Sequence, residues 1–214
     1  MRSSTDRRPP QRSDLRRQAI LTALDRWLQD SDLDAINIAE IAKEAGVTRS
    51  AFYFYFENKA AAVAALMEQM VDETLVVNDI FTTATATASP EARIHTMLDG
   101  LFAMWERHRH LFKAMLEARG TGGSIHDIWD GARASFVDSV AAMIRADRAA
   151  GRAPDGLDAA VLASVLLEVN DRMLERLTLG GGLTRAQLRD GAAAIWLSTI
   201  YGINWMPERS QETA

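Results

Sequence analysis

The sequence predicts an all-α fold of about nine helices, in which a small three-helix domain precedes a larger helical domain. Apolar residues recur at helical spacing through most of the 214 residues. Alternation of apolar and polar residues, which is typical of strands, does not extend over a useful length. Segments containing glycine or proline separate the helical stretches. With 48% hydrophobic residues, the chain can bury a substantial core.

A flexible arm and one amphipathic helix open the chain. Residues 1–12 are rich in Arg, Ser and Pro and show no periodicity, which is typical of a mobile arm. Ser13 or Asp14 can cap a helix that ends between residues 30 and 34. Apolar residues at positions 20, 24, 27 and 28 form one stripe on this helix, so we expect it to cover the helices that follow.

Residues 37–59, NIAEIAKEAGVTRSAFYFYFENK, contain two short helices around a glycine turn. Asn37 with Glu40 three positions later resembles a capping box at the start of the first helix. Gly46 can adopt the left-handed backbone conformation that a sharp turn requires. Thr48 can then cap the second helix. This arrangement predicts a helix-turn-helix, whose second helix enters the major groove of DNA.

The aromatic run at the end of this stretch divides into inward and outward side chains. Phe52 and Phe56 are four residues apart, so they can share the buried face of a helix. Tyr53 and Tyr55 are then expected to point outward, where phenol hydroxyls can donate to DNA phosphates. Lys59 opens the next helix, where its charge opposes the helix dipole but suits a phosphate contact. Ordinary surface packing is the alternative for these three residues.

Residues 15–66, and AGVTRSAFYFYFENKAA in particular, resemble the DNA-binding domain of the TetR family of bacterial transcriptional regulators. The resemblance implies base-edge contacts from the first turn of the second helix, by Arg49, Ser50 and Ala51. It also implies contacts to backbone phosphates, by Asn37, Thr48, Tyr53, Tyr55 and Lys59. Many members have His in place of Tyr55 and Thr in place of Ala51, so the base sequence of the operator is not predicted.

Charge is distributed unevenly along the chain. The net charge is −5, but residues 1–60 contain 10 Lys and Arg against 9 Asp and Glu, whereas residues 61–214 contain 14 against 20. Six of the first 17 residues are Arg. This asymmetry is expected when only the N-terminal end faces phosphates, although a solvated tail without DNA contacts would produce it too.

The rest of the chain continues with helical patterns. They run from Lys59 to about Leu75 and then over residues 90–106, 110–118, 125–150, 158–179 and 184–203. The predicted domains are an arm (1–12), the helix-turn-helix domain (13–60), a ligand-binding and dimerisation domain (61–206) and a tail (207–214). The longest uncharged stretch, 191–207, is shorter than the ~20 apolar residues of a membrane span. Without cysteines or a signal-peptide pattern, the chain is expected in the cytoplasm.

A candidate ligand site centres on Asn170, which interrupts a nearly continuous apolar helix, VLASVLLEVN. A buried Asn needs hydrogen-bond partners, and a ligand can be one of them, although a structural partner is the commoner case. Most of residues 94–203 resemble the EthR branch of the TetR family, in the stretch IWDGARASFVDSVAAMIRADRAAGRAP, the triplet at 170–172 and the closing IWLSTIYG. The resemblance implies an apolar tunnel lined by Ile94, Met97, Leu101, Trp105, Trp129, Phe136, Leu167, Asn170 and Trp196. Large aromatics are also ordinary core residues.

The last two long helices carry a second pattern. Residues 160–169 are apolar almost all round, and residues 191–194 are small. These helices can bury one face in their own chain and present another to a second copy, which predicts a four-helix dimer interface. An ordinary single-chain core helix is the alternative.

These patterns together favour a homodimeric repressor of a palindromic operator, released by an apolar small molecule and requiring no cofactor or metal. A DNA-binding protein without ligand control is the second hypothesis. An enzyme is disfavoured: His108 and His110, two residues apart on a helix, point in different directions and make a poor metal site. Asp171 and Glu175 have Arg172 and Arg176 as neighbours, which suggests solvated ion pairs rather than acid–base catalysis.

Overall fold

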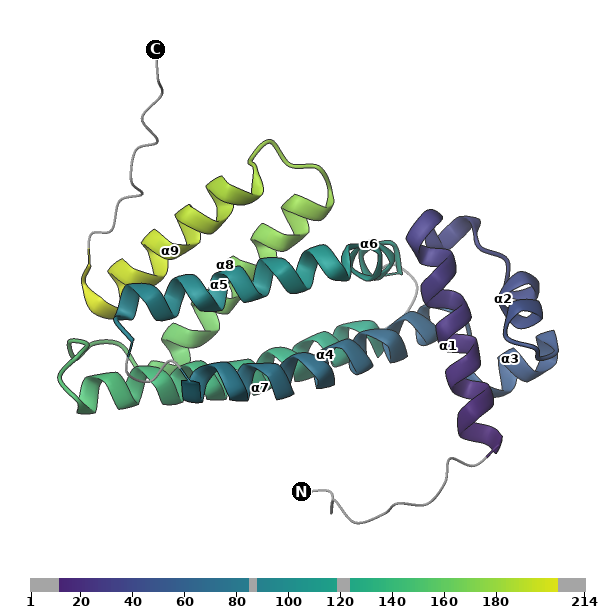
Figure 1. The fold of residues 1–214 in the computed structure, drawn as a ribbon, viewed down its shortest axis with the longest axis horizontal. Helices are drawn as coiled ribbons and strands as arrows, with labels where there is room; N and C mark the ends of the chain where they lie inside the picture. The colour runs from purple at the N-terminus through teal and green to yellow at the C-terminus, as the bar shows by residue number, and fades with distance from the viewer. Residues whose placement is uncertain (1–11, 85–87, 119–123, 204–214) are drawn as a thin grey trace. The chain divides into compact units, whose positions relative to one another are not determined.

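The computed structural model describes residues 12–84, 88–118 and 124–203 (Figure 1). Within these ranges the chain forms nine α-helices, one 3₁₀ turn and no strand, which confirms the predicted all-α fold. The elements are α1 (Arg12–Asp30), η1 (Leu33–Ala35), α2 (Ile38–Glu44), α3 (Arg49–Tyr55), α4 (Lys59–Ala84), α5 (Pro90–Arg107), α6 (Arg109–Ala118), α7 (Ser124–Ala149), α8 (Ala159–Thr178) and α9 (Arg185–Tyr201). None of the described helices has the length and apolar character of a membrane span.

The chain divides into two compact units. The first comprises residues 1–70 and 113–128, and the second comprises residues 71–112 and 129–214. Helices α4, α6 and α7 contribute residues to both units. The domain boundary predicted at residue 60 lies within the first turn of α4.

Side-chain caps set the starts of several helices of the second unit. The cap predicted at Ser13 or Asp14 is wrong, because α1 begins at Arg12 and both residues lie inside it. Ser89 Oγ accepts a hydrogen bond from the Ala92 N–H at the start of α5, with Pro90 in the first turn. Asp158 caps α8. Thr184 and Gln187 form a reciprocal capping box at the start of α9. Each of these caps joins residues at most three positions apart, so each is a local interaction.

The first unit is built around α1, which packs on α2, while α2 packs on α3. The predicted stripe of α1 is buried at Ile20, Leu24 and Leu28. Trp27 is a correction to that stripe, because it is only half-buried and its buried indole N–H has no hydrogen-bond partner among the described residues. Leu21, which is fully buried, completes the packed face instead.

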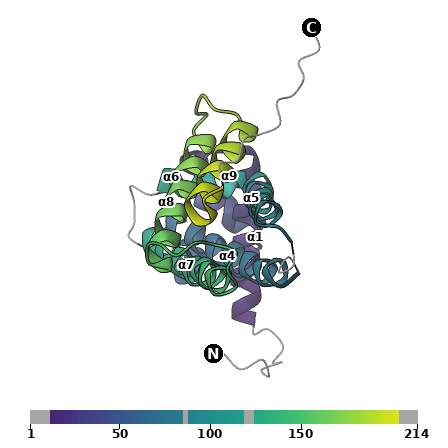
Figure 2. The same cartoon turned by 90° about the vertical axis from the view of Figure 1, so that its left-hand side faces the viewer.

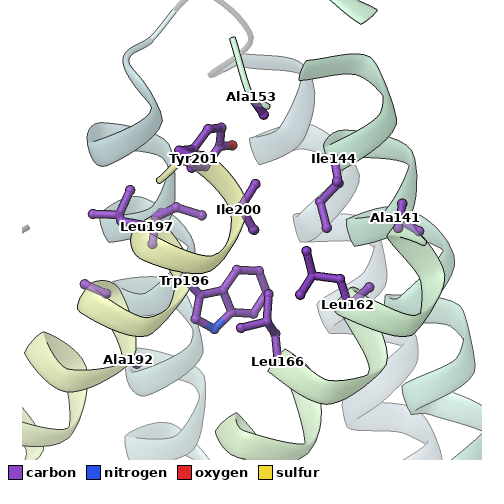
Figure 3. Packing of buried hydrophobic residues seen from close by; sticks show 14 of the residues in the cluster. Ala141, Ile144, Ala153, Leu162, Leu166, Ala192, Trp196, Leu197, Ile200 and Tyr201 are labelled. Carbon is purple, nitrogen blue, oxygen red and sulfur yellow. The ribbon is translucent and has the colours of Figure 1, made fainter. Parts of the chain in front are cut away.

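In the second unit, α9 contacts both α5 and α8 and lies between them when the helices are viewed end-on (Figure 2). Its buried side chains meet those of α5, α7 and α8 in one apolar cluster (Figure 3). Trp196 of α9 has no exposed surface and packs among aliphatic side chains, including Ile144, Leu162, Leu166 and Ile200. Burial of such side chains stabilises the unit by about 1.5–3 kcal/mol each.

A buried carboxylate joins three helices of the second unit. Asp147 of α7 is 1% exposed. It accepts hydrogen bonds from both terminal nitrogens of Arg93 on α5 (3.2 and 2.5 Å), from Arg152 (3.0 and 2.7 Å) and from the Tyr201 hydroxyl on α9 (2.6 Å). Burial alone would raise the pKa of Asp147, but the bonds from Arg93, Tyr201 and Arg152 outweigh it and lower that pKa. Burial and the bond to Asp147 raise the pKa of Tyr201.

Candidate nucleic-acid interface and ligand site

A glycine turn sets the angle between α2 and α3. Gly46 has φ +67°, in the left-handed region that favours glycine. The Val47 N–H donates to the Ala42 carbonyl (2.9 Å) and the Gly46 N–H donates to the Lys43 carbonyl (3.2 Å). These two bonds form a Schellman motif, which satisfies the last carbonyls of α2 and ends the helix. The chain is then directed straight into Thr48, the N-cap of α3.

Helix α3 separates its aromatic side chains as the sequence predicted for Phe52, Phe56 and Tyr53. Phe52 is fully buried and Phe56 is 5% exposed, whereas Tyr53 is 46% exposed. Arg49 and Tyr53 lie one turn apart, and the Arg49 Cζ is 5.9 Å from the centre of the Tyr53 ring. This distance is within reach of a cation–π interaction, so Arg49 and Tyr53 form one outward stripe of the helix.

Thr48 and Ser50 stand together at the N-terminus of α3. Thr48 Oγ1 accepts a hydrogen bond from the Ala51 N–H (3.1 Å) and lies 3.0 Å from Ser50 Oγ. Arg49 and Ser50 are both exposed, and Ala51 is half-buried. Exposed hydroxyl and guanidinium groups at the start of a recognition helix are the groups that can reach base edges and phosphates.

Tyr55 points outward less than the sequence predicted, because it follows Phe52 by three positions and shares part of the buried face. It is half-buried, and its hydroxyl accepts a long hydrogen bond from Ser13 Oγ of α1 (3.4 Å). Its ring meets that of Phe54 edge to face, with centres 5.1 Å apart.

Phe54 is an exposed residue that the sequence reasoning missed. Its side chain is 79% exposed, more than that of any other described large apolar residue. It follows Ser50 by four positions, so it extends a second outward stripe beside the one formed by Arg49 and Tyr53. Helical spacing from Ser50 could have identified it. An exposed aromatic side chain here can make apolar contact with a thymine methyl group.

Asn37 and Lys59 both contact the backbone near the start of α2. Asn37 Oδ1 accepts from the Ala39 N–H (2.9 Å), so its cap bond goes to Ala39 rather than to Glu40 as a capping box would require. The Lys59 ammonium donates to the carbonyls of residues 33, 34 and 36, at 2.5, 3.2 and 2.8 Å. Arg49 and Lys59 line an open depression together with residues 34–38.

The predicted ligand-contact residues that can be described lie in or near the core of the second unit. Ile94 and Trp196 are fully buried in the apolar cluster, and the partly buried side chains packed against it include Met97, Leu101 and Leu167. Phe136 is half-buried. Trp105 is 6% exposed, and its indole N–H donates to Thr178 Oγ1 (2.9 Å). The side chain of Trp129 lies outside the described residues.

Asn170 is the polar group of this core and is 4% exposed. Its Oδ1 accepts a hydrogen bond from the indole N–H of Trp196 (3.2 Å). Among the described residues, the Asn170 side chain makes this one hydrogen bond, so its amide nitrogen keeps two donors. The carbonyl oxygen of the Asn170 side chain therefore has a partner in the described part of the protein, whereas its amide nitrogen does not. A buried carbonyl or ether oxygen of a ligand could accept from the remaining donors.

Two family models match the chain. Residues 20–66 match the model of bacterial regulatory proteins of the tetR family, and residues 94–202 match the C-terminal domain of the transcriptional regulator EthR. The HTH-type transcriptional regulator EthR of Mycobacterium tuberculosis is 30% identical over 193 residues, which cover 89% of each chain. The two matched segments contain the helix-turn-helix and the Asn170–Trp196 core.

Solved structures share the fold at lower identity. A TetR-family transcriptional regulator from Mesorhizobium loti matches with a TM-score of 0.69 and 17% identity, covering 89% of this chain and 98% of its own. FadR from Bacillus subtilis, solved in complex with stearoyl-CoA, matches with a TM-score of 0.64 and 15% identity, covering 86% of this chain and 99% of its own.

Proposed function

Because the chain belongs to the TetR family of bacterial transcriptional regulators and carries an EthR-type C-terminal domain, we propose that it is a homodimeric repressor that an apolar small molecule releases from a palindromic operator. The chain is a helix-turn-helix transcriptional regulator and not an enzyme. The observation that carries the proposal is the outward face of α3, where Arg49, Ser50 and Tyr53 are all exposed next to a capped N-terminus.

The proposed DNA contacts divide into two groups. Arg49, Ser50 and Ala51 would contact base edges in the major groove, which determines sequence preference. Contacts to phosphates would come from Asn37, Thr48, Tyr53 and Tyr55. The phosphate contacts would position the domain, and their loss would weaken binding to all sequences alike.

A second copy of the chain is the proposed partner of α8 and α9. Val161 and Val165 lie one turn apart on α8 and are 56% and 55% exposed. Ile195 of α9 is 42% exposed, and the exposed Gly191 lies one turn before it. Exposed valines on α8, with an exposed isoleucine and an exposed glycine one turn apart on α9, suit close packing of two helix pairs about a two-fold axis. Such a dimer would present two recognition helices to two half-sites.

The proposed effector is an apolar molecule with a hydrogen-bond acceptor. The core around Trp196 supplies apolar surface, and the free donors of Asn170 supply one point of orientation. The B. subtilis relative was solved with stearoyl-CoA, a ligand with a long acyl chain. An acyl or comparable apolar compound therefore stands first among candidates. It would release DNA only if it binds the DNA-free conformation more tightly.

The test of this function begins with selection of duplexes from a random library by the purified protein. We expect a palindromic site, and a much weaker affinity for a scrambled duplex of the same composition. Equal affinity for both duplexes would refute the specific repressor. A series of apolar acyl compounds, followed by thermal shift and by loss of operator binding, then tests ligand control. If no compound stabilises the protein, the second hypothesis, a DNA-binding protein without ligand control, is favoured.

Sedimentation, which measures the oligomeric state, tests the proposed dimer. Val165→Asp and Ile195→Asp each place a charge in the proposed interface and should yield monomers. Leu183→Asp is the matched control, because Leu183 is 56% exposed in the segment between α8 and α9. If all three variants remained dimeric, or if the unaltered chain were monomeric, this interface would be refuted.

A further inference from the structure

We propose that Lys59 is a positioning residue, which holds the backbone that leads into α2, and that it is not a phosphate ligand. This role rests on the proposed DNA-binding function, because the element that it positions is the helix-turn-helix. The family resemblance implies a phosphate contact at this position, whereas the geometry of the side chain indicates a different use.

The Lys59 ammonium has three N–H donors, and three backbone carbonyls surround it. It lies 2.5 Å from the carbonyl oxygen of Leu33, 2.8 Å from that of Ile36 and 3.2 Å from that of Asp34. The carbonyls belong to η1 and to the residue just after it. Every donor of the ammonium is therefore committed to the protein's own backbone.

Breaking the bonds between the Lys59 ammonium and these carbonyls would destabilise the first unit. The side chains of Leu33 and Ile36 are both 3% exposed, so this backbone lies at the edge of the core of the first unit. Hydrogen bonds to a charged group are stronger than those between neutral groups. A phosphate that attracted the ammonium away would have to replace all three bonds.

The bonds tie together the two ends of the helix-turn-helix. Residues 33–36 directly precede Asn37, the N-cap of α2, and Lys59 is the first residue of α4. Asn58 Oδ1 accepts from the Ala61 N–H (2.8 Å) and fixes the start of α4, so the base of the Lys59 side chain is anchored. The three bonds from the Lys59 ammonium to the carbonyls of residues 33, 34 and 36, here called the clamp, thus join residue 33 to residue 59. Helices α2 and α3 lie in the segment between these two residues.

An anion also holds this backbone segment. Glu117 Oε2 accepts a hydrogen bond from the Leu33 N–H (2.7 Å). A carboxylate on the first N–H of η1 and an ammonium on the carbonyls of residues 33, 34 and 36 match the direction of the peptide dipoles in the turn. Both charges therefore stabilise one conformation of the segment that sets where α2 begins.

Hydrogen exchange tests the clamp without DNA. Lys59→Met removes the ammonium and keeps most of the stem, while Lys59→Arg keeps the charge but replaces a compact three-donor group with a planar fork. We expect both variants to raise the amide exchange rates of residues 33–41 at least tenfold. The matched control is Lys43→Met, the same substitution at an exposed lysine of α2. Unchanged exchange in both Lys59 variants would overturn the proposal.

Salt dependence tests the phosphate role. The probe is a 30-base-pair duplex of mixed sequence, because non-specific binding depends on phosphate contacts and needs no known operator. Each phosphate contact contributes about 0.9 to the slope of log K against log salt. We expect Lys59→Met to weaken binding several-fold at every salt concentration, with the same slope as Lys43→Met. A slope lower by about 0.9, with Lys59→Arg binding like the unaltered chain, would overturn the proposal.

Failure of the proposed DNA-binding function and failure of the proposed Lys59 role would give different results. If the unaltered chain bound no duplex, the proposed function would fail, while the exchange comparison would still decide whether Lys59 holds the backbone. If Lys59→Met did not fold, Lys59→Arg would decide both the hydrogen-exchange and the DNA-binding experiments. A phosphate ligand tolerates this change, whereas the clamp does not.

Discussion

Replacing Asp147 with Ala should destabilise the second unit strongly. The substitution removes the common acceptor of Arg93, Arg152 and Tyr201. The Arg93 side chain is 9% exposed and would keep a charge without its partner, whereas the Arg152 side chain is 44% exposed and can be hydrated. Breaking a buried ion pair from one side costs about 3–5 kcal/mol. We expect the free energy of unfolding to fall by about this amount.

Thermal and urea unfolding at one fixed protein concentration measure this loss, since association would make the stability depend on concentration. For a chain of this size, about 1 kcal/mol lowers Tm by about 2–4 °C, so a decrease of about 6–20 °C is expected. Asp138→Ala is the matched control, because Asp138 is an exposed aspartate of the same helix, and it should stay within about 0.5 kcal/mol. Tyr201→Phe removes one bond to the carboxylate and should cost about 1.5–3 kcal/mol.

The pH dependence has a definite sign. The folded-state pKa of Asp147 is lowered, so its contribution is fully present above the unfolded value of about 3.9 and is lost as pH falls through the folded value. Asp147→Asn should therefore be less stable than the unaltered chain at pH 7, and this difference should shrink below about pH 4. A loss under about 1 kcal/mol for Asp147→Ala, or a difference for Asp147→Asn that stays constant from pH 7 to pH 3, would refute the reasoning.

Other substitutions test the remaining sites. Thr48→Ala removes the α3 cap and should lower stability by about 0.5–2 kcal/mol in urea unfolding, and no measurable loss would contradict a role in capping. Gly46→Ala forces a side chain into the left-handed region and should cost about 1–2 kcal/mol in the same assay, although space for the Cβ is available. Arg49→Ala should relax the preference for particular base pairs in competition binding, and an equal loss on all sequences would refute a base contact. Asn170→Leu should abolish the effector's thermal shift while operator affinity persists, whereas loss of folding would identify Asn170 as purely structural.

The helix-turn-helix could be predicted closely because its signals are local. The glycine turn at Gly46 and the caps at Asn37 and Thr48 depend on backbone conformation and on bonds across two or three residues. The buried Phe52 follows from helical spacing alone. The assignment of the chain to its family also rests on such short, ordered patterns.

Hydrogen-bond partners that are far apart in the sequence could not be predicted. Local spacing around Asp147 does not predict its partners, because Arg93 and Tyr201 are each 54 residues away. Trp196, predicted to line a ligand tunnel, supplies its indole N–H to Asn170, 26 residues away. No rule of local spacing identifies which of several Arg, Tyr or Trp residues will meet a given buried polar group.

Lys59 shows most directly what the sequence determines and what only the tertiary structure decides. The sequence determined that a lysine would stand at the first position of a helix, next to a DNA-reading motif, where its charge opposes the helix dipole. Only the tertiary structure placed the carbonyls of residues 33, 34 and 36 around its ammonium. Helix starts and turns are determined by neighbours along the chain, whereas the environment of a charged side chain depends on which distant backbone groups the packed helices bring to it.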